Sequence, residues 1–161
     1  MPLASLLAES RILVNLRAQN KAEAIRMMVD RLVSSGRLEA ETRDVVIDAL
    51  EAREKVSSTA LDYGIAIPHA TVEAVTAIEA VLGVLPAGIP FDAPDGQPVK
   101  LIILLLIPRS AVRRYSSTLA GIARLLSKEE TREALLRAET PEKALEALRT
   151  REHLDAKEEI Q

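Results

Sequence analysis

The feature that most constrains this chain is the segment Val99–Ile107, which is aliphatic at every position except Lys100. It is far too short to cross a bilayer as a helix, which takes about 20 apolar residues. A strand that is buried on both faces has this composition, because helices cover both sides of its sheet. The segment therefore predicts a central strand and an α/β fold.

Composition limits the class of protein further. The chain has 161 residues, of which 48% are hydrophobic and 28% charged, and these values suit one compact domain. Its net charge of −3 provides no positive field for a phosphate backbone, so we predict no nucleic-acid partner. The segment Met1–Ser10 lacks the features of a signal peptide, and cysteine is absent. Both observations agree with a cytoplasmic protein that does not insert into a membrane.

Local patterns place the other elements. Short apolar runs predict strands at Ile12–Leu16 and at Ile78–Leu85, the second closed by Pro86 and Gly88. Apolar residues at helical spacing predict five helices. The first runs from Ala22 to a stop at Gly36, with Asn20 as N-cap, and the second covers 39–53, with Val45, Val46, Ala49 and Leu50 facing inward. The third covers 113–127, the fourth is capped by Ser127 and Glu130 and ends at Ala138, and the fifth runs from Pro141 to about Thr150, with Thr140 as N-cap.

The two histidines lie in different settings. His153 falls in the charged segment 151–161, which we predict to be a frayed, solvated tail. His69 follows the apolar run Gly64–Pro68, and Pro68 lacks a backbone donor, so strand pairing is expected to stop before His69. Open α/β sheets place ligand sites at such strand ends. Position alone leaves two readings open, a functional histidine and a buried histidine that is hydrogen-bonded for structural reasons.

The functional reading has a definite chemistry. An imidazole with a pKa of about 6.5 is mostly neutral at pH 7, so one ring nitrogen has a free lone pair that can attack phosphorus. The phosphoryl group then needs cations or donors around it. Arg53, near the end of the second predicted helix, has a planar guanidinium that suits phosphate oxygens. Taken alone, however, Arg53 is better explained as a solvated cation that complements the helix dipole.

Several segments in one order carry a family resemblance. Arg53-Glu54, Ser58-Thr59 and Gly64–His69 resemble the enzyme IIA domain of the mannitol/fructose and nitrogen-regulatory type (type 2) of the bacterial phosphoenolpyruvate:sugar phosphotransferase system. Gly88–Asp92 and Asp95–Val99 agree with it. The likeness extends from about Leu6 to Arg149, so we predict a IIA domain over 1–150 and the tail beyond it.

The resemblance implies a mixed β-sheet between helical layers, in one domain. It also implies that His69 accepts phosphate from the histidine carrier protein HPr or its nitrogen-branch relative. His69 would pass the group to a IIB permease domain or use it as a signal to a regulatory target protein. Arg53 matches an arginine that borders the site, and Thr59 lies in the adjoining segment. Transfer between histidines requires no metal and no cofactor.

Two segments depart from the family pattern. Tyr115 occupies the position at which family members have a second histidine, and Ala60–Tyr63 replaces a glycine-rich loop. Tyrosine donates one neutral hydrogen bond and carries no positive charge near pH 7. The lost charge-assisted bond costs about 1.5 to 3 kcal/mol unless Arg113 or Arg114 replaces it. Tyr115 also lies on the apolar stripe of its helix, so core packing is an equal alternative.

Two functions follow. The first is a phosphoryl carrier in which His69 is phosphorylated, Arg53 and Tyr115 complete the catalytic site, and Thr59 and Arg114 support the phosphate. The second is a regulatory protein-binding domain with weak or no phosphorylation, motivated by Tyr115 and the altered loop. A metallohydrolase is not predicted, because one candidate histidine with scattered carboxylates falls short of a three-ligand site.

Overall fold

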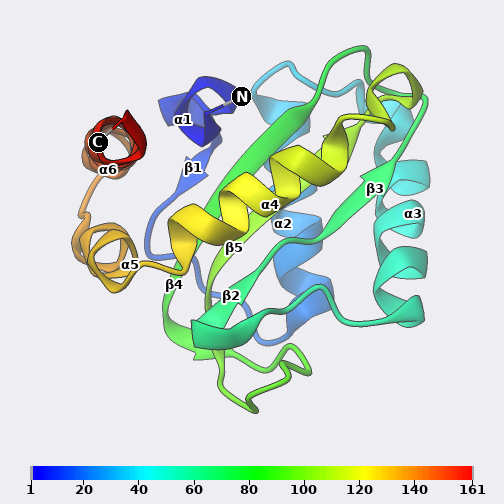
Figure 1. Cartoon of the computed structure of the whole chain (residues 1–161). Coiled ribbons are helices and arrows are strands. Elements are labelled where there is room, and N and C mark those ends of the chain that lie inside the picture. The colour runs from blue at the N-terminus through cyan, green and yellow to red at the C-terminus, as the bar shows by residue number, and fades with distance from the viewer. Residues whose placement is uncertain (1, 161) are drawn as a thin grey trace.

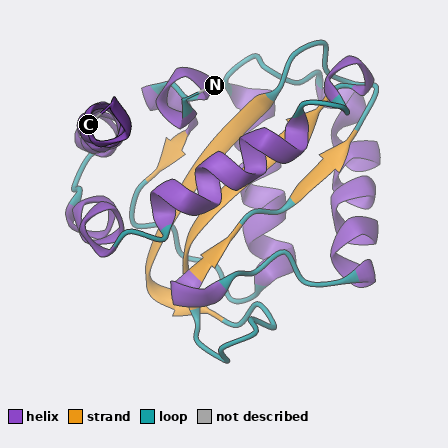
Figure 2. Cartoon of the chain, viewed as in Figure 1, coloured by secondary structure: helices purple, strands orange, loops and turns teal. Residues whose placement is uncertain are grey.

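The computed structural model describes residues 2–160, which form one mixed sheet with helices on both faces (Figures 1 and 2). The strands are β1 (Ile12–Leu13), β2 (Ile65–Ala66), β3 (His69–Thr71), β4 (Glu79–Ile89) and β5 (Val99–Ile107). The helices are α1 (Leu3–Leu6), α2 (Lys21–Ser34), α3 (Arg43–Val56), α4 (Tyr115–Leu126), α5 (Glu129–Arg137) and α6 (Pro141–Ile160). Short 3-10 turns add η1 (Glu9–Arg11), η2 (Ala40–Thr42), η3 (Asp62–Gly64) and η4 (Arg109–Ala111).

The aliphatic segment forms the central strand, as predicted. The sheet order is β1-β4-β5-β2, β3 also pairs with β5, and β4 is the antiparallel neighbour of β5. Alternate residues of β5 contribute to two separate cores: Ile102, Leu104 and Leu106 belong to one, and Leu101, Ile103 and Leu105 to the other. The first core includes α2 and α3, and the second includes α1, α4, α5 and α6. The prediction of a mixed sheet between helical layers is confirmed.

The capping residues predicted for α2 and α6 occur at the ends of these helices. The Asn20 side chain accepts a hydrogen bond from the Glu23 N–H at 2.9 Å, and α2 is followed by Gly36 with φ of +78°. The Thr140 hydroxyl oxygen accepts from the Lys143 N–H at 3.1 Å at the start of α6. No helix within residues 2–160 is long and apolar enough to cross a membrane.

The predicted strand ends are wrong in three places. β1 ends at Leu13 and not at Leu16. β4 does not stop at Pro86 but continues to Ile89, with an irregularity in its pairing with β5 after Val84. A bulge of this kind accommodates the proline in the strand. Pairing also does not end before His69: the Pro68 carbonyl accepts from the Leu105 N–H at 2.9 Å, and β3 continues alongside β5. Pro68 lacks a donor, but its carbonyl is still available to the ladder.

Two details of the predicted helices are also wrong. Val45 is 69% exposed, and Ile47 takes the buried position expected for it on α3. Ser127 does not cap α5: its hydroxyl donates to the Arg124 carbonyl at 2.7 Å, and Lys128 is the N-cap residue. The serine hydroxyl therefore bonds a backbone carbonyl at the C-terminal end of α4 and does not bond an N–H group of α5. A serine side chain between two helices can form either bond.

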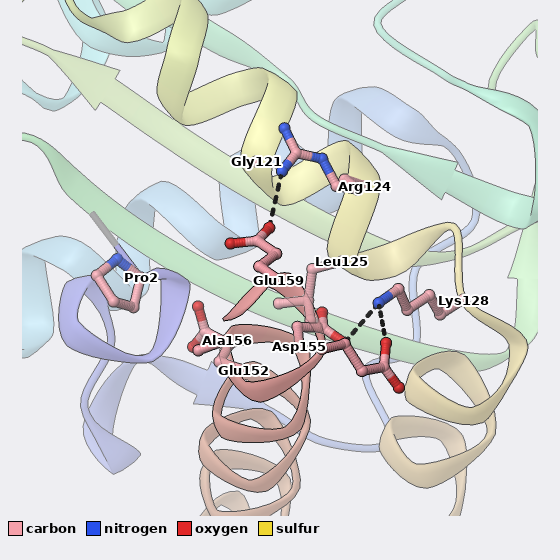
Figure 3. Close-up of a pocket in the computed structure, with 10 residues that line it drawn as sticks. Pro2, Gly121, Arg124, Leu125, Lys128, Glu152, Asp155, Ala156 and Glu159 are labelled. Atoms are coloured by element: carbon pink, nitrogen blue, oxygen red, sulfur yellow. Dashed lines mark hydrogen bonds and ion pairs between the residues drawn. The ribbon is translucent and has the colours of Figure 1, made fainter. Parts of the chain in front are cut away.

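The last helix extends ten residues beyond the end predicted near Thr150, because tertiary contacts hold its C-terminal half. The Glu152 carboxylate accepts from the backbone N–H groups of Leu3 and Ala4 at 2.7 and 2.8 Å. Farther along α6, acidic side chains pair with Arg124 and Lys128 around a cavity of about 420 Å³ (Figure 3). These contacts tie α6 to the chain's first helix and to α4, so residues 151–160 continue the helix.

Candidate functional site

His69 lies in a pocket between the end of α3 and the middle of α4. The residue begins β3, and its side chain is half-buried. The pocket has a volume of about 320 Å³. It is lined by Arg53 from α3, by Ser58, Thr59 and Leu61 from the following segment, by Ile67 and His69, and by Leu119, Ala120 and Ala123 from α4. Three of the predicted site residues, His69, Arg53 and Thr59, therefore share one pocket.

The hydrogen bond of the His69 ring defines its tautomer. Nδ1 lies 2.7 Å from the Ile67 carbonyl oxygen. A carbonyl only accepts, so Nδ1 bears the hydrogen and Nε2 keeps a free lone pair. The pKa of His69 is lowered from its ordinary value, mainly because the ring is buried. The positive charge of Arg53 lowers this pKa further, whereas the hydrogen bond to Ile67 and the negative charge of Glu54 raise it by less than the total lowering. The ring is therefore neutral at pH 7, the form that a nucleophile requires.

Arg53 satisfies both interpretations of its sequence position. Its Nη1 donates to the Ser57 carbonyl oxygen at 2.9 Å, which is the usual role of a cation at a helix C-terminus. The same side chain lines the His69 pocket, and its charge acts on the ring. One Nη group is thus held by the backbone, while the rest of the guanidinium provides donors for an anion in the pocket.

Thr59 is held by a buried carboxylate. Its hydroxyl and its backbone N–H both donate to Glu54, the second bond at 3.2 Å. Glu54 is 7% exposed, and Lys21 of α2 lies 3.7 Å from it. This network fixes the segment that leaves α3 and enters the pocket. In the sequence, Glu54 was noted only as part of a motif. Its position four residues after Leu50 places it on the buried stripe of α3, and a charged residue on such a stripe indicates a buried carboxylate with polar partners.

Tyr115 lies beside His69. The two ring centroids are 6.1 Å apart and the planes are tilted by 39°. Tyr115 is half-buried and also packs against the core beneath α4. The packing role that the sequence offered for Tyr115 is therefore present, and its ring lies near the His69 ring although Tyr115 is not among the residues that line the His69 pocket.

Arg114 points to a different part of the molecule. It lines a separate pocket with Leu6 and Pro108 and is not among the residues that line the His69 pocket. In the altered loop, Leu61 lines the His69 pocket, whereas Tyr63 is exposed and stacks on the Arg132 guanidinium at 4.7 Å. His153 is exposed on α6. Within residues 2–160, no group of three or more His, Asp or Glu side chains is placed to hold a metal ion.

Comparison with known proteins identifies the family. The model of the family described as phosphoenolpyruvate-dependent sugar phosphotransferase system, EIIA 2, matches residues 5–150. The chain belongs to this family. The family resemblance that the sequence indicated is confirmed, and the match covers all but the first four and the last eleven residues of the chain.

Relatives of this IIA domain are of two kinds. It is 35% identical to the fructose-specific EIIA component of Haloferax volcanii over 128 residues, which are 80% of this chain and 82% of the relative. It is also 35% identical to a nitrogen regulatory protein of Bradyrhizobium diazoefficiens over 130 residues, 81% of this chain and 83% of the relative. Sequence similarity thus links the IIA domain to both the sugar-specific and the nitrogen-regulatory branches.

Solved structures share its fold. The nitrogen regulatory protein IIA-Ntr of Neisseria meningitidis superimposes with a TM-score of 0.82 at 29% identity, covering 91% of this chain and 98% of the other. The mannitol enzyme IIA of Escherichia coli, in a complex with phosphorylated enzyme IIB, superimposes with a TM-score of 0.74 at 27% identity, covering 89% and 97%. The chain therefore has the IIA fold of these proteins.

Proposed function

We propose that this IIA domain is a phosphoryl carrier with His69 as the acceptor. The observation that carries the proposal is the bond from His69 Nδ1 to the Ile67 carbonyl, which leaves Nε2 as the nucleophilic atom in a pocket that contains Arg53. The donor we propose is a phosphohistidine on the histidine carrier protein HPr or its nitrogen-branch relative. The recipient we propose is a IIB domain, because the mannitol relative forms a complex with phosphorylated enzyme IIB, or a regulatory target protein.

The transfer step balances without a metal or an external base. The Nε2 lone pair of His69 forms a bond to phosphorus while the N–P bond of the donor breaks, and its electron pair returns to the donor imidazole. The Nδ1 hydrogen stays on the His69 ring. Its bond to the Ile67 carbonyl stabilises the positive charge that the ring acquires when Nε2 is phosphorylated.

The other pocket residues have distinct roles in this proposal. Arg53 neutralises part of the phosphoryl charge through its free guanidinium donors. Tyr115, whose ring centroid lies 6.1 Å from that of His69 beside the pocket, would offer a neutral hydroxyl donor to the phosphoryl group. Thr59, whose hydroxyl is committed to Glu54, acts as a positioning residue that keeps the pocket wall in place. Arg114 has no part in the phosphate site, since it lines another pocket.

The direct test is phosphorylation by phosphoenolpyruvate, enzyme I and a histidine carrier protein, followed by intact mass measurement. We expect the mass of one phosphate, lost on acid treatment and absent in His69→Gln. The matched control is His153→Gln, which changes the exposed histidine of α6 and keeps full phosphorylation. Phosphorylation that persists in His69→Gln would overturn the assignment of the acceptor.

A second function is favoured by one observation, the tyrosine at position 115 in place of a residue that can carry a charge. In this alternative the domain binds regulatory partners by contact and is phosphorylated slowly or not at all. No mass change with several carrier proteins, combined with partner binding that His69→Gln leaves intact, would support it over the carrier.

A further inference from the structure

A second pocket lies on the other side of the α4 N-terminus from His69. It has a volume of about 430 Å³ and is enclosed by α1, the segment before β4, η4 and the first turn of α4. Four hydroxyl side chains line it, Thr76, Ser110, Ser117 and Thr118, and Arg114 is its one charged residue. No carboxylate is among the lining residues. The pocket therefore offers hydrogen-bond donors and a positive charge with no competing negative charge.

The start of α4 adds to this positive character. The N-terminal N–H groups of a helix lack partners within the helix, and the helix dipole places partial positive charge there. No side chain caps the N-terminus of α4, and its first turn contains no acidic residue. Arg114 takes part in none of the ion pairs found among residues 2–160. Neither the helix end nor the guanidinium is thus neutralised by the protein itself.

Thr118 provides an independent indication of a ligand. The residue is only 8% exposed and lines this pocket, yet no hydrogen bond from its hydroxyl is found in the part of the chain that the structure describes. The neighbouring Ser117 differs, because its hydroxyl donates to the Arg114 carbonyl at 2.8 Å. Within residues 2–160 the Thr118 hydroxyl is not among the fully buried side-chain atoms that lack a partner, so it is open to the pocket and available to donate to a ligand oxygen.

We propose that this pocket binds a small organic anion through a carboxylate or phosphate group. Arg114, the Thr118 hydroxyl and the α4 N-terminus hold the anionic group. Leu6, Ile78 and Pro108 form an apolar wall for a short carbon skeleton. The site is separate from the His69 pocket and does not depend on phosphoryl transfer there.

Titration followed by amide NMR tests the proposal with three probes: inorganic phosphate, glycerol 3-phosphate and succinate. We expect at least one probe to give saturable shifts in the amides of residues 116–118 and 76. The probe that binds most tightly distinguishes a phosphate site from a carboxylate site. Arg114→Gln and Thr118→Val should each weaken this binding by about tenfold or more, because each removes a charged or buried donor.

Two control variants separate this site from other anion binding. Arg113→Gln removes the adjacent exposed cation, which does not line the pocket, and should leave the affinity within about twofold. Arg53→Gln removes the cation of the His69 pocket and should also preserve the shifts at residues 116–118. The proposal is overturned if no probe saturates, or if Arg114→Gln and Thr118→Val bind as the wild type does. Melting curves of both variants exclude misfolding as the cause of lost binding.

Discussion

The substitution Tyr115→His tests how much a charge opposite His69 contributes to phosphoryl transfer. The wild-type side chain lies 6.1 Å from the His69 ring, centroid to centroid, and offers only a neutral hydroxyl. Histidine at this position becomes cationic when the pH falls below about 6.5. We therefore expect the variant to stabilise phosphorylated His69 at acidic pH and to lose this advantage at alkaline pH.

The separation gives the magnitude. Phosphorylated His69 has about two negative charges on the phosphoryl group and one positive charge on the ring, so its net charge is about −1. With the ring separation as the approximate distance, opposite unit charges about 6 Å apart attract by about 0.7 kcal/mol in bulk water and by about 2.7 kcal/mol at an effective dielectric constant of about 20. These energies correspond to about a threefold and about a hundredfold change in an equilibrium constant. The half-buried His69 lies between these two environments. We therefore expect Tyr115→His to increase the phosphorylation equilibrium constant by a factor within this range.

The assay measures phosphoryl exchange at equilibrium. A phosphorylated histidine carrier protein is mixed with each variant, and intact mass gives the phosphorylated fraction of both partners. Measurements at about pH 6 and about pH 8.5 lie on either side of the titration of the introduced histidine. The informative quantity is the ratio of the variant to the wild type at each pH, because it cancels the titration of the carrier.

Tyr115→Phe is the matched control, because it keeps the ring and removes the hydroxyl without adding charge. It should lower the equilibrium constant by a factor that corresponds to about 1 kcal/mol, the contribution of one neutral hydrogen bond. If Tyr115→His and Tyr115→Phe behave alike at both pH values, position 115 does not act on the phosphate. Tyr115 would then have only its packing role beneath α4.

Four further predictions concern the pocket and its supports. The rate of His69 phosphorylation should stay constant down to about pH 6.5 and fall only below it, since burial lowers the pKa of His69; a decline that begins above pH 6.5 would contradict this. Between the lowered pKa and about 6.5 the unfolded chain binds more protons, so the free energy of unfolding should rise with pH there, and His69→Gln should lack this rise. Glu54→Gln should reduce the free energy of unfolding in urea by about 1 to 3 kcal/mol, whereas Glu51→Gln on the same helix, which loses only an exposed ion pair, should change it by less than about 1 kcal/mol. Gly64→Ala should destabilise more than Gly36→Ala, because both have positive φ but only at Gly64 does a Cβ meet a backbone oxygen, at 3.0 Å; equal losses would refute the steric argument.

Elements specified by neighbouring residues could be predicted from the sequence. The central strand was evident from its aliphatic composition, and α2 from Asn20 at one end and Gly36 at the other. The errors fall where a distant segment decides the outcome. β4 continues past Pro86 because β5 pairs with Ile89, and α6 continues past Thr150 because Glu152 binds the N–H groups of α1. Propensity within a short window contains no information about such contacts.

The candidate site was predicted as a set of residues but not as a network. His69, Arg53 and Thr59 come from segments close in sequence. The family resemblance assigned them to one site, and the structure places them in one pocket. The ion pair of the buried Glu54 with the half-buried Lys21 joins α3 to α2 and could not be inferred from spacing. Its consequence for the site is indirect, because Glu54 holds Thr59 while its charge partly offsets the effect of Arg53 on the pKa of His69.

The position of Arg114 follows from the geometry of α4 itself. Consecutive helical residues diverge by about 100°, whereas residues four apart share a face. Tyr115 therefore lies in line with Leu119 and Ala123, which line the His69 pocket, and Arg114 lies in line with Thr118, which lines the second pocket. A cation at position 114 consequently lies on the side of α4 that faces the second pocket, and in the phosphoryl site that we propose Arg53 is the cation that lines the His69 pocket. The same periodicity makes one helix the common wall of two chemically different pockets.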